Sequence, residues 1–132
     1  MRSVLFAGSE ALPFAATGGL GDVMGSLPAA VKAAHPEIDV RAVMPLYSKV
    51  GRQYRDMMKF EKSITVTLAW RRLYCGIFSL EKDGVKWYFL DNEYYFLRDR
   101  IYGEFDDGER FAFFCKAVID LLRPDVEKAI QN

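Results

Sequence analysis

The chain has 132 residues, of which 51% are hydrophobic and 27% charged, as in an ordinary globular protein with one core. Eighteen basic residues balance eighteen acidic ones, so the formal net charge is zero and favours neither nucleic acid nor an anionic membrane as a partner. We find no apolar run that could span a bilayer and no signal-peptide core. We therefore expect one soluble domain, residues 1–132, in the cytoplasm.

Residues 3–8 are predicted to form a short apolar strand, and the segment after it is the most informative of the chain. Residues 8–23 read GSEALPFAATGGLGDV and lead into a helical pattern. Glycines at the mouth of a helix let a ligand approach the backbone closely, and the first N–H groups of the helix favour an anionic oxygen. The segment predicts a phosphate or sugar-phosphate site, with a tight strand-to-helix turn as the alternative.

A helix is expected over residues 20–34, followed by a buried strand at 39–44 that Pro45 ends. Because Pro28 would remove an intrahelical hydrogen bond, we predict a break or kink near Ser26. The helical spacing predicts a buried face made of Leu20, Val23, Leu27, Val31 and Ala34.

The middle of the chain indicates antiparallel hairpins. Turns are expected at Arg71-Arg72 and at Lys82-Asp83-Gly84, where Asp-Gly is a strong hairpin signal. Residues 51–60 form a polar loop or a short helix. Three runs rich in Thr, Val, Ile and aromatic residues predict strands at 63–70, 73–80 and 85–90.

A second long helix is expected after Asp106 or Asp107, with Asp106 and Glu109 as a capping box, and Arg123-Pro124 ends it. Residues 125–132 form a final helical turn or a frayed tail. The order of elements predicts an α/β fold, a Rossmann-like parallel sheet with an antiparallel hairpin extension. The apolar stripe of this helix is predicted to consist of Phe111, Phe114, Cys115, Val118, Leu121 and Leu122.

Few side chains are obvious candidates for chemistry. The only histidine, His35, has no triad or metal partners nearby in sequence, so we expect a structural or solvent-exposed role. Cys75 and Cys115 form neither a metal motif nor a disulfide framework, so no metal or redox cofactor is implied. Asp22 either stabilises a helix N-terminus or lines a cleft. A cluster of aromatic residues packs in the core or on sugar rings: Tyr94, Tyr95, Phe96 and Tyr102.

The segment SEALPFAATGGLGDV, residues 9–23, resembles the N-terminal signature of bacterial glycogen synthases and plant starch synthases. Further blocks occur in the family's order: MPLY at 44–47, FLDNEYYF at 89–96, and RD, IYG and DDGERFAFF between 98 and 114. The resemblance implies a retaining glucosyltransferase that adds glucose from ADP-glucose to the non-reducing end of an α-1,4-glucan. It also implies the GT-B architecture, in which two Rossmann-type domains face each other across a cleft.

The resemblance also implies roles for single residues. Gly18 and Gly19, with Thr17 beside them, would hold the donor's phosphate or sugar through backbone N–H groups. Asp22 would line the catalytic cleft, and Tyr102 would contact the glucan acceptor. Ala16 stands where the family has a lysine that reaches the donor phosphates, so this chain lacks that cation.

The chain also departs from the family at its end. After the second helix, the family has a catalytic histidine in a Pro-Asp-apolar-apolar-His-x-x-Asp-Trp segment, whereas residues 124–128 here read PDVEK. Glycogen synthases are several times longer, and their second domain supplies catalytic Arg, Lys and Glu residues. We therefore expect an incomplete N-terminal half of a GT-B enzyme that is inactive alone. The alternative is a free-standing, non-catalytic carbohydrate- or nucleotide-binding module. A dinucleotide-dependent oxidoreductase is disfavoured because the G-x-G-x-x-G spacing is absent.

Overall fold

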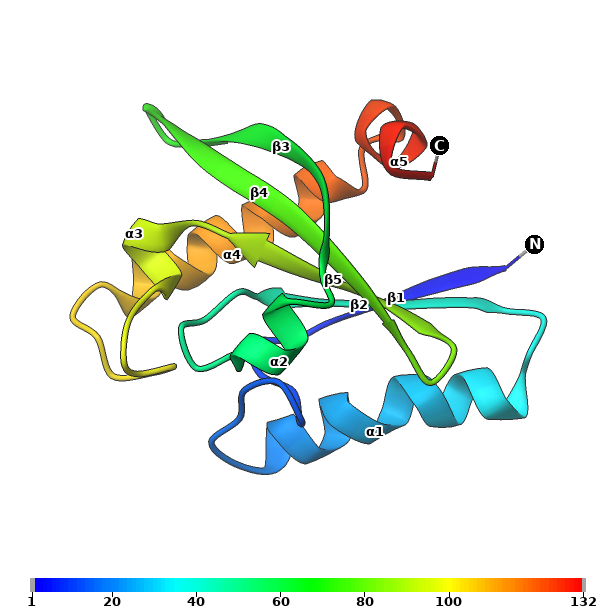
Figure 1. Cartoon of the computed structure of the whole chain (residues 1–132). Coiled ribbons are helices and arrows are strands. Elements are labelled where there is room, and N and C mark those ends of the chain that lie inside the picture. Colours follow the sequence, from blue (N-terminus) through cyan, green and yellow to red (C-terminus); the bar gives the residue numbers. More distant parts are fainter. Residues whose placement is uncertain (1, 132) are drawn as a thin grey trace.

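The computed structural model describes residues 2–131 as one five-stranded sheet with helices packed on it (Figure 1). The strands are β1 (Ser3–Ala7), β2 (Asp39–Pro45), β3 (Lys59–Leu68), β4 (Arg71–Lys82) and β5 (Val85–Asp91). The helices are α1 (Gly19–Ala34), α2 (Arg52–Arg55), α3 (Glu93–Phe96), α4 (Asp107–Leu121) and α5 (Pro124–Gln131).

The sheet has the order β1-β2-β5-β4-β3 and combines two kinds of pairing. The strands β1, β2 and β5 are parallel, whereas β4 and β3 add antiparallel ladders to the β5 edge. This confirms the predicted Rossmann-like sheet with an antiparallel hairpin extension. Strand β2, the middle one of the three parallel strands, is apolar and buried from Ala42 to Pro45, as expected for a parallel strand covered on both faces. Figure 1 shows α1 below the sheet and α4 on its other side.

The turns of the antiparallel part follow local backbone chemistry. Asp83 and Gly84 have φ values of 54° and 78° and connect β4 to β5, which confirms the predicted Asp-Gly hairpin. The turn predicted at Arg71-Arg72 was wrong. Arg71 pairs with Leu68, so the turn consists of Ala69 and Trp70, and both arginines belong to β4. Strands β3 and β4 therefore start earlier than predicted, whereas β5 starts at Val85 as predicted.

Helix α1 differs from the prediction in two respects. It continues through Pro28 without a break near Ser26, whose hydroxyl donates to the Asp22 carbonyl at 2.8 Å. Its buried face is made of Gly21, Met24 and Pro28. The predicted apolar face is wrong, because Leu20, Val23 and Leu27 are between 43% and 53% exposed.

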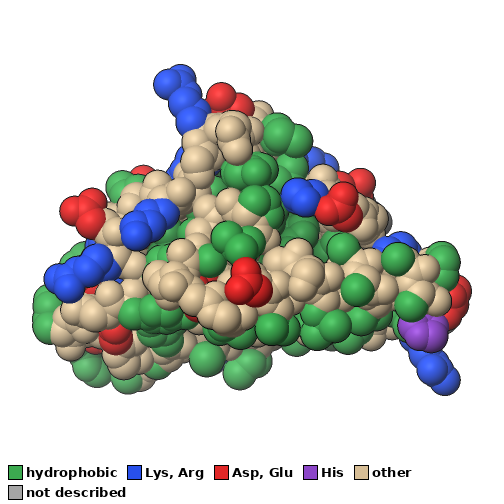
Figure 2. Space-filling view, turned by 90° about the horizontal axis from the view of Figure 1, so that it is seen from below, with side chains coloured by type: hydrophobic (Ala, Val, Ile, Leu, Met, Phe, Trp, Pro, Cys, Tyr) green, Lys and Arg blue, Asp and Glu red, His purple; other side chains and the backbone are tan. Residues whose placement is uncertain are grey.

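Small residues explain the rotation of α1. A Cβ at Gly25 would lie 2.5 Å from the Leu12 carbonyl oxygen, and a Cβ at Gly8 would lie 2.7 Å from Met24 Cγ. The helix therefore packs closely on the preceding loop at its glycines, and Leu20, Val23 and Leu27 are turned away. Figure 2 shows the underside of the molecule, with hydrophobic side chains in a row along its lower margin.

Helix α4 forms as predicted, but the capping box was wrong. Asp106 precedes the helix, yet its carboxylate binds Arg98 at 2.5 and 2.8 Å instead of capping. Glu109 binds Arg71 on the neighbouring hairpin at 2.7 Å. Asp107 accepts the backbone N–H groups of residues 103 and 104 instead. Tertiary partners thus replace the expected local hydrogen bonds.

The stripe predicted for α4 was right for Phe114 and Leu121, which are buried. It was wrong for Cys115 and Leu122, which are exposed, while Phe113 and Ala117 take the buried positions. The alternatives at the end of the chain resolve as helix α5, with Asn132 outside the described residues. Residues 51–60 contain the short helix α2 and the first residues of β3.

Candidate functional site

The carboxyl ends of the parallel strands β1, β2 and β5 meet at one edge of the sheet. The loops that follow them are residues 8–18, 46–51 and 92–106, and Figure 1 shows them together at the left of the molecule. In open α/β sheets, ligands bind outside the carboxyl ends of the strands. The glycine segment and Tyr102, singled out from the sequence, both lie at this edge.

The loop from β1 to α1 is fixed by its own hydrogen bonds. Ala11 exchanges backbone hydrogen bonds with Ala15 at 2.9 and 3.0 Å, and the Leu12 N–H donates to the Gly21 carbonyl at 3.0 Å. Glu10, only 4% exposed, accepts hydrogen bonds from the backbone N–H and, at 3.1 Å, from the hydroxyl of Thr17. These hydrogen bonds fix the backbone that precedes Gly18 and Gly19.

Packing accounts for one glycine of this motif but not for two others. A Cβ at Gly21 would lie 2.3 Å from the Ala16 Cβ, so this position has no room for a side chain. A Cβ at Gly18 or Gly19 would meet nothing within 4 Å. Neither of these two has a positive φ, and both are exposed. No contact within the described residues requires glycine at positions 18 and 19, so the backbone there is open to a ligand.

The start of α1 combines a feature that favours an anion, backbone N–H groups that no side chain of the cap residue occupies, with one that disfavours it, the negative charge of Asp22. Gly18 is the N-cap residue and offers no side chain to the first N–H groups of the helix. Asp22 lies exposed in the first turn, where its charge interacts favourably with the helix dipole. Ala16, half-buried within the loop, supplies no positive charge.

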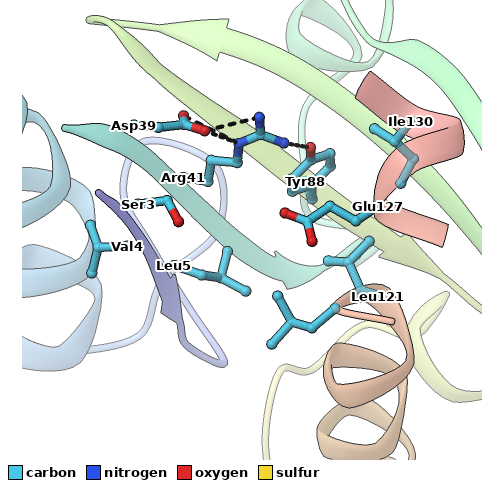
Figure 3. Close-up of a pocket in the computed structure, with 10 residues that line it drawn as sticks. Ser3, Val4, Leu5, Asp39, Arg41, Tyr88, Leu121, Glu127 and Ile130 are labelled. Carbon is cyan, nitrogen blue, oxygen red and sulfur yellow. Dashed lines mark hydrogen bonds and ion pairs between the residues drawn. The ribbon is translucent and has the colours of Figure 1, made fainter. Parts of the chain in front are cut away.

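Arg41 does not replace the missing cation. It lies in β2 on a cavity of about 60 Å³, which Ser3 from the start of β1 also lines. Figure 3 shows its guanidinium between Asp39 and Tyr88, at 3.0 Å from the carboxylate and 2.5 Å from the hydroxyl. The candidate loop follows the opposite end of β1, and the Arg41 guanidinium is paired with Asp39. Arg41 therefore supplies no cation to the loop.

Tyr102 is tied to the end of β1. Its hydroxyl shares a hydrogen bond of 2.5 Å with Ser9 Oγ, and the hydroxyl of the buried Tyr47 donates to the Ser9 carbonyl at 2.6 Å. Burial raises the pKa of both tyrosines above its usual value. Tyr102 also lines an open, mainly apolar groove of about 660 Å³ between the end of β1 and helix α4, together with Gly8 and Leu20. Its half-buried ring is therefore positioned toward an open surface.

The rest of the aromatic cluster divides between core and surface. Tyr95 and Phe96 are fully buried, which fits the core alternative, whereas Tyr94 is 64% exposed.

His35 is exposed and lies 3.5 Å from Glu37, as expected for a residue outside any catalytic set. Within residues 2–131 there is no group of three His, Cys, Asp or Glu residues that could hold a metal ion. None of the helices within residues 2–131 combines the length and the apolar character that a bilayer-spanning segment needs.

Sequence reasoning missed Glu10, Ser9 and Tyr47 as parts of this site. The one available signal was the charged Glu10 in a segment of otherwise small and apolar residues. A carboxylate there has to find donors close by, because burying it without hydrogen bonds is costly.

Comparison with known proteins adds independent findings. Residues 3–130 match the sequence model of a family described as the starch synthase catalytic domain. The glycogen synthase of Clostridium novyi (strain NT) is 51% identical over 120 residues, 91% of this chain and 25% of that protein. That of Anoxybacillus flavithermus (strain DSM 21510 / WK1) is 50% identical over 119 residues, with coverages of 90% and 24%. The chain thus spans about a quarter of the length of these relatives.

A solved structure shows the same fold. The catalytic domain of starch synthase IV from Arabidopsis thaliana, bound to ADP and acarbose, matches with a TM-score of 0.77 and 26% identity. The match covers 92% of this chain and 25% of that one. The likeness therefore extends over nearly the whole sheet and its helices.

Proposed function

The chain belongs to the starch synthase catalytic-domain family, and we propose that it is part of a retaining glucosyltransferase that adds glucose from ADP-glucose to the non-reducing end of an α-1,4-glucan. Its relatives at about half identity are named glycogen synthases. The related Arabidopsis structure holds ADP and acarbose, a nucleotide and a sugar-like ligand. The cytoplasmic location expected from the sequence is part of this proposal.

One observation carries the proposal at the level of residues. Gly18 and Gly19 are open, exposed and free of packing conflict, at a helix N-terminus whose cap residue has no side chain. Backbone N–H groups and the helix dipole together favour a phosphate oxygen at such a place. A side chain there would stand between the ligand and the backbone. The donor's phosphate or sugar is the ligand that this arrangement fits.

The proposal assigns the remaining residues around that contact. The hydrogen bonds from Thr17 to Glu10 fix the backbone just before the two glycines. Asp22, in the first turn of α1, faces the cleft, and Tyr102 contacts the acceptor from the groove between the end of β1 and α4. Ala16 adds no charge, so the donor phosphates depend on backbone groups and on cations outside this chain.

Glucosyl transfer needs groups fixed on both sides of the reacting carbon. We infer that residues 1–132 form one wall of a GT-B cleft as an incomplete N-terminal half, and that the second wall belongs to the part of the relatives that this chain does not span. The chain alone therefore transfers no glucose. Its own contribution is to orient the donor at the glycine loop and the glucan beside it.

A chimaera tests this proposal. Residues 3–123 replace the matching segment of the C. novyi glycogen synthase, which keeps its own sequence from the Pro-Asp-apolar-apolar-His motif onward, and incorporation of radiolabelled glucose from ADP-glucose into glycogen is measured. We expect transfer by the folded chimaera and none by the 132-residue chain above a buffer blank. An inactive but folded chimaera would contradict the proposal, and binding of glucan or ADP by the chain in that case would favour the non-catalytic module.

A further inference from the structure

Arg110, near the start of α4, is an arginine that is completely buried. Its guanidinium carbon lies 5.8 Å from the ring centre of Phe96 and 5.4 Å from that of Phe111. Burying a charge is costly unless hydrogen bonds and an opposite charge compensate for it. Replacing a buried ion pair by apolar side chains often leaves stability unchanged. The reason for an arginine at this position is therefore to be sought in the groups that its N–H donors bind.

The hydrogen bonds of this guanidinium join α4 to the segment that precedes the helix. Its Nε donates to the Tyr95 carbonyl at 2.7 Å, in α3. Its Nη1 donates to the Ile101 carbonyl at 3.0 Å, and its Nη2 donates to the Arg100 carbonyl at 3.4 Å. The carboxylate of Asp107 accepts a further hydrogen bond at 2.8 Å and pairs with the charge. One side chain thus fixes the two residues that come directly before Tyr102.

Asp107 fixes the two residues that come directly after Tyr102. Its carboxylate accepts the backbone N–H of Gly103 at 2.8 Å and that of Glu104 at 3.1 Å. Gly103 has a φ of 96°, which glycine adopts without the strain that a Cβ would add. The pair of Arg110 and Asp107 therefore holds the backbone on both sides of Tyr102.

The side chain of Tyr102 depends on the position of this backbone. Its ring lies 5.7 Å from that of Phe111, the same ring that lies next to the Arg110 guanidinium. Its hydroxyl shares the hydrogen bond of 2.5 Å with Ser9, in the loop that leads to the exposed glycines. A hydrogen bond weakens quickly when its partners move apart. The ring therefore keeps its place at the groove only while residues 100–104 stay in position.

We propose that Arg110 and Asp107 are positioning residues for the acceptor, which act by holding Tyr102 at the groove. The identity of the acceptor, the α-1,4-glucan, rests on the proposed function. Because the ring is held in place before the glucan arrives, less conformational freedom is lost on binding. Asp107 also lines the groove, so the fully buried Arg110 is the residue that separates positioning from direct contact.

Backbone order in the 132-residue chain tests the positioning without any glucose transfer. The NMR order parameter of Tyr102 should be about 0.85 in the parent chain, as for rigid backbone, and should fall below about 0.6 in Arg110→Met. Methionine keeps an apolar stem but has no donor. Arg110→Lys keeps the charge beside Asp107 but cannot reach all four acceptors, so an intermediate value is expected.

Asp107→Ala carries the same prediction if Arg110→Met does not fold. The Asp107 side chain is 32% exposed, so its removal leaves no buried cavity. It takes away the acceptor of both N–H groups after Tyr102, and the order parameter should again fall below about 0.6.

Asp120→Ala is the matched control. It removes an ion pair of 2.7 Å with Lys116, in the same helix and with one nearly buried partner, about three turns beyond Arg110. This variant should be less stable than the parent chain, yet the order parameter of Tyr102 should stay the same. A loss of order caused by general destabilisation would appear in this control as well.

Kinetics of the chimaera link the loop to the acceptor. Arg110→Met and Asp107→Ala should each raise KM for glycogen about tenfold, the equivalent of about 1.4 kcal/mol, while KM for ADP-glucose changes little. The decisive comparison repeats Arg110→Met in a Tyr102→Ala background. There it should raise KM for glycogen no further, because residues that act through one another are not additive.

Three results would overturn the positioning role. These are an order parameter of Tyr102 near 0.85 in the folded variants, an unchanged KM for glycogen, or an equal rise in KM with and without the Tyr102 side chain. An inactive, folded chimaera rejects the transferase, whereas the order parameters still decide whether the pair holds Tyr102. An active chimaera with unchanged loop order rejects only the positioning role.

Discussion

Glu10 accepts two hydrogen bonds from Thr17, one from its backbone N–H and one from its hydroxyl at 3.1 Å. This contact ties Glu10, three residues after the end of β1, to the residue before the exposed glycines, across the loop. Because the carboxylate of Glu10 is 4% exposed, the contact is a fixed internal link rather than a surface pair. The orientation of Gly18 and Gly19 therefore depends on a side chain that does not itself reach the ligand.

Replacing Glu10 should loosen the donor loop. In the chimaera, Glu10→Ala removes the acceptor of both hydrogen bonds, whereas Glu10→Gln keeps an oxygen at the same place. We expect Glu10→Ala to raise KM for ADP-glucose about tenfold, the equivalent of about 1.4 kcal/mol. Glu10→Gln should be affected less, and KM for glycogen should change little. A parallel rise in both KM values would show a general loss of structure and would contradict the positioning role.

Ala16→Lys restores the cation that the family resemblance implies at this position. A charge-assisted hydrogen bond contributes about 1.5–3 kcal/mol, so KM for ADP-glucose in the chimaera should fall about tenfold or more. Ala16→Met is the matched control for side-chain length without charge. Steady-state kinetics with each substrate varied separately distinguishes the effects. If the lysine variant is no better than the methionine variant, Ala16 does not mark a missing phosphate contact.

The Arg98–Asp106 pair should make stability depend on pH. Hydrogen bonding to Arg98 holds the pKa of Asp106 below its ordinary value. A depressed pKa stabilises the fold above the unfolded value, about 3.9, and this contribution is lost as the pH falls through the folded value. Asp106→Asn should cost up to about 1 kcal/mol at pH 7, and its difference from the parent chain should shrink below about pH 4. Urea unfolding between pH 7 and 2.5 measures it, and a constant difference would be inconsistent with this origin.

Ala69→Gly should stabilise the chain. Ala69 has a φ of 55°, in the left-handed region that costs a non-glycine residue about 1 kcal/mol or more. Glycine removes this strain but adds entropy to the unfolded chain, so we expect a net gain of about 0.5 kcal/mol. Ala30→Gly, at an exposed position inside α1, should instead lose about 1 kcal/mol. Thermal or urea unfolding of both variants measures these changes in the free energy of unfolding. A less stable Ala69→Gly variant would show that the backbone at Ala69 is not strained.

The sequence predicted the parts of the fold that depend on local chemistry. The glycine loop after the first strand, the Asp83-Gly84 hairpin and the buried second strand all follow from backbone preferences or apolar runs. These signals act over a few residues, so tertiary contacts have little chance to override them. The parallel sheet followed from the alternation of strands and helices.

The features that the sequence could not predict depend on contacts between residues distant in the chain. Helix α1 turns its glycines rather than Leu20 and Val23 toward the loop, because Leu12 approaches its backbone closely. Asp106 binds Arg98 instead of forming a capping box with Glu109. Rules based on helical periodicity and capping consider only residues close in sequence, so they do not predict these contacts. The exposed Trp70 was likewise indistinguishable from an aromatic residue of a strand.

Gly19→Val in the chimaera tests the central claim most directly, with Gly108→Val as its matched control. Both glycines are in the first turn of a helix, and a Cβ at either meets nothing within 4 Å, so neither change disturbs packing. The account predicts that Gly19→Val raises KM for ADP-glucose or abolishes transfer, while Gly108→Val leaves KM for ADP-glucose unchanged. Unchanged donor KM and kcat in Gly19→Val would mean that the loop is only a structural turn.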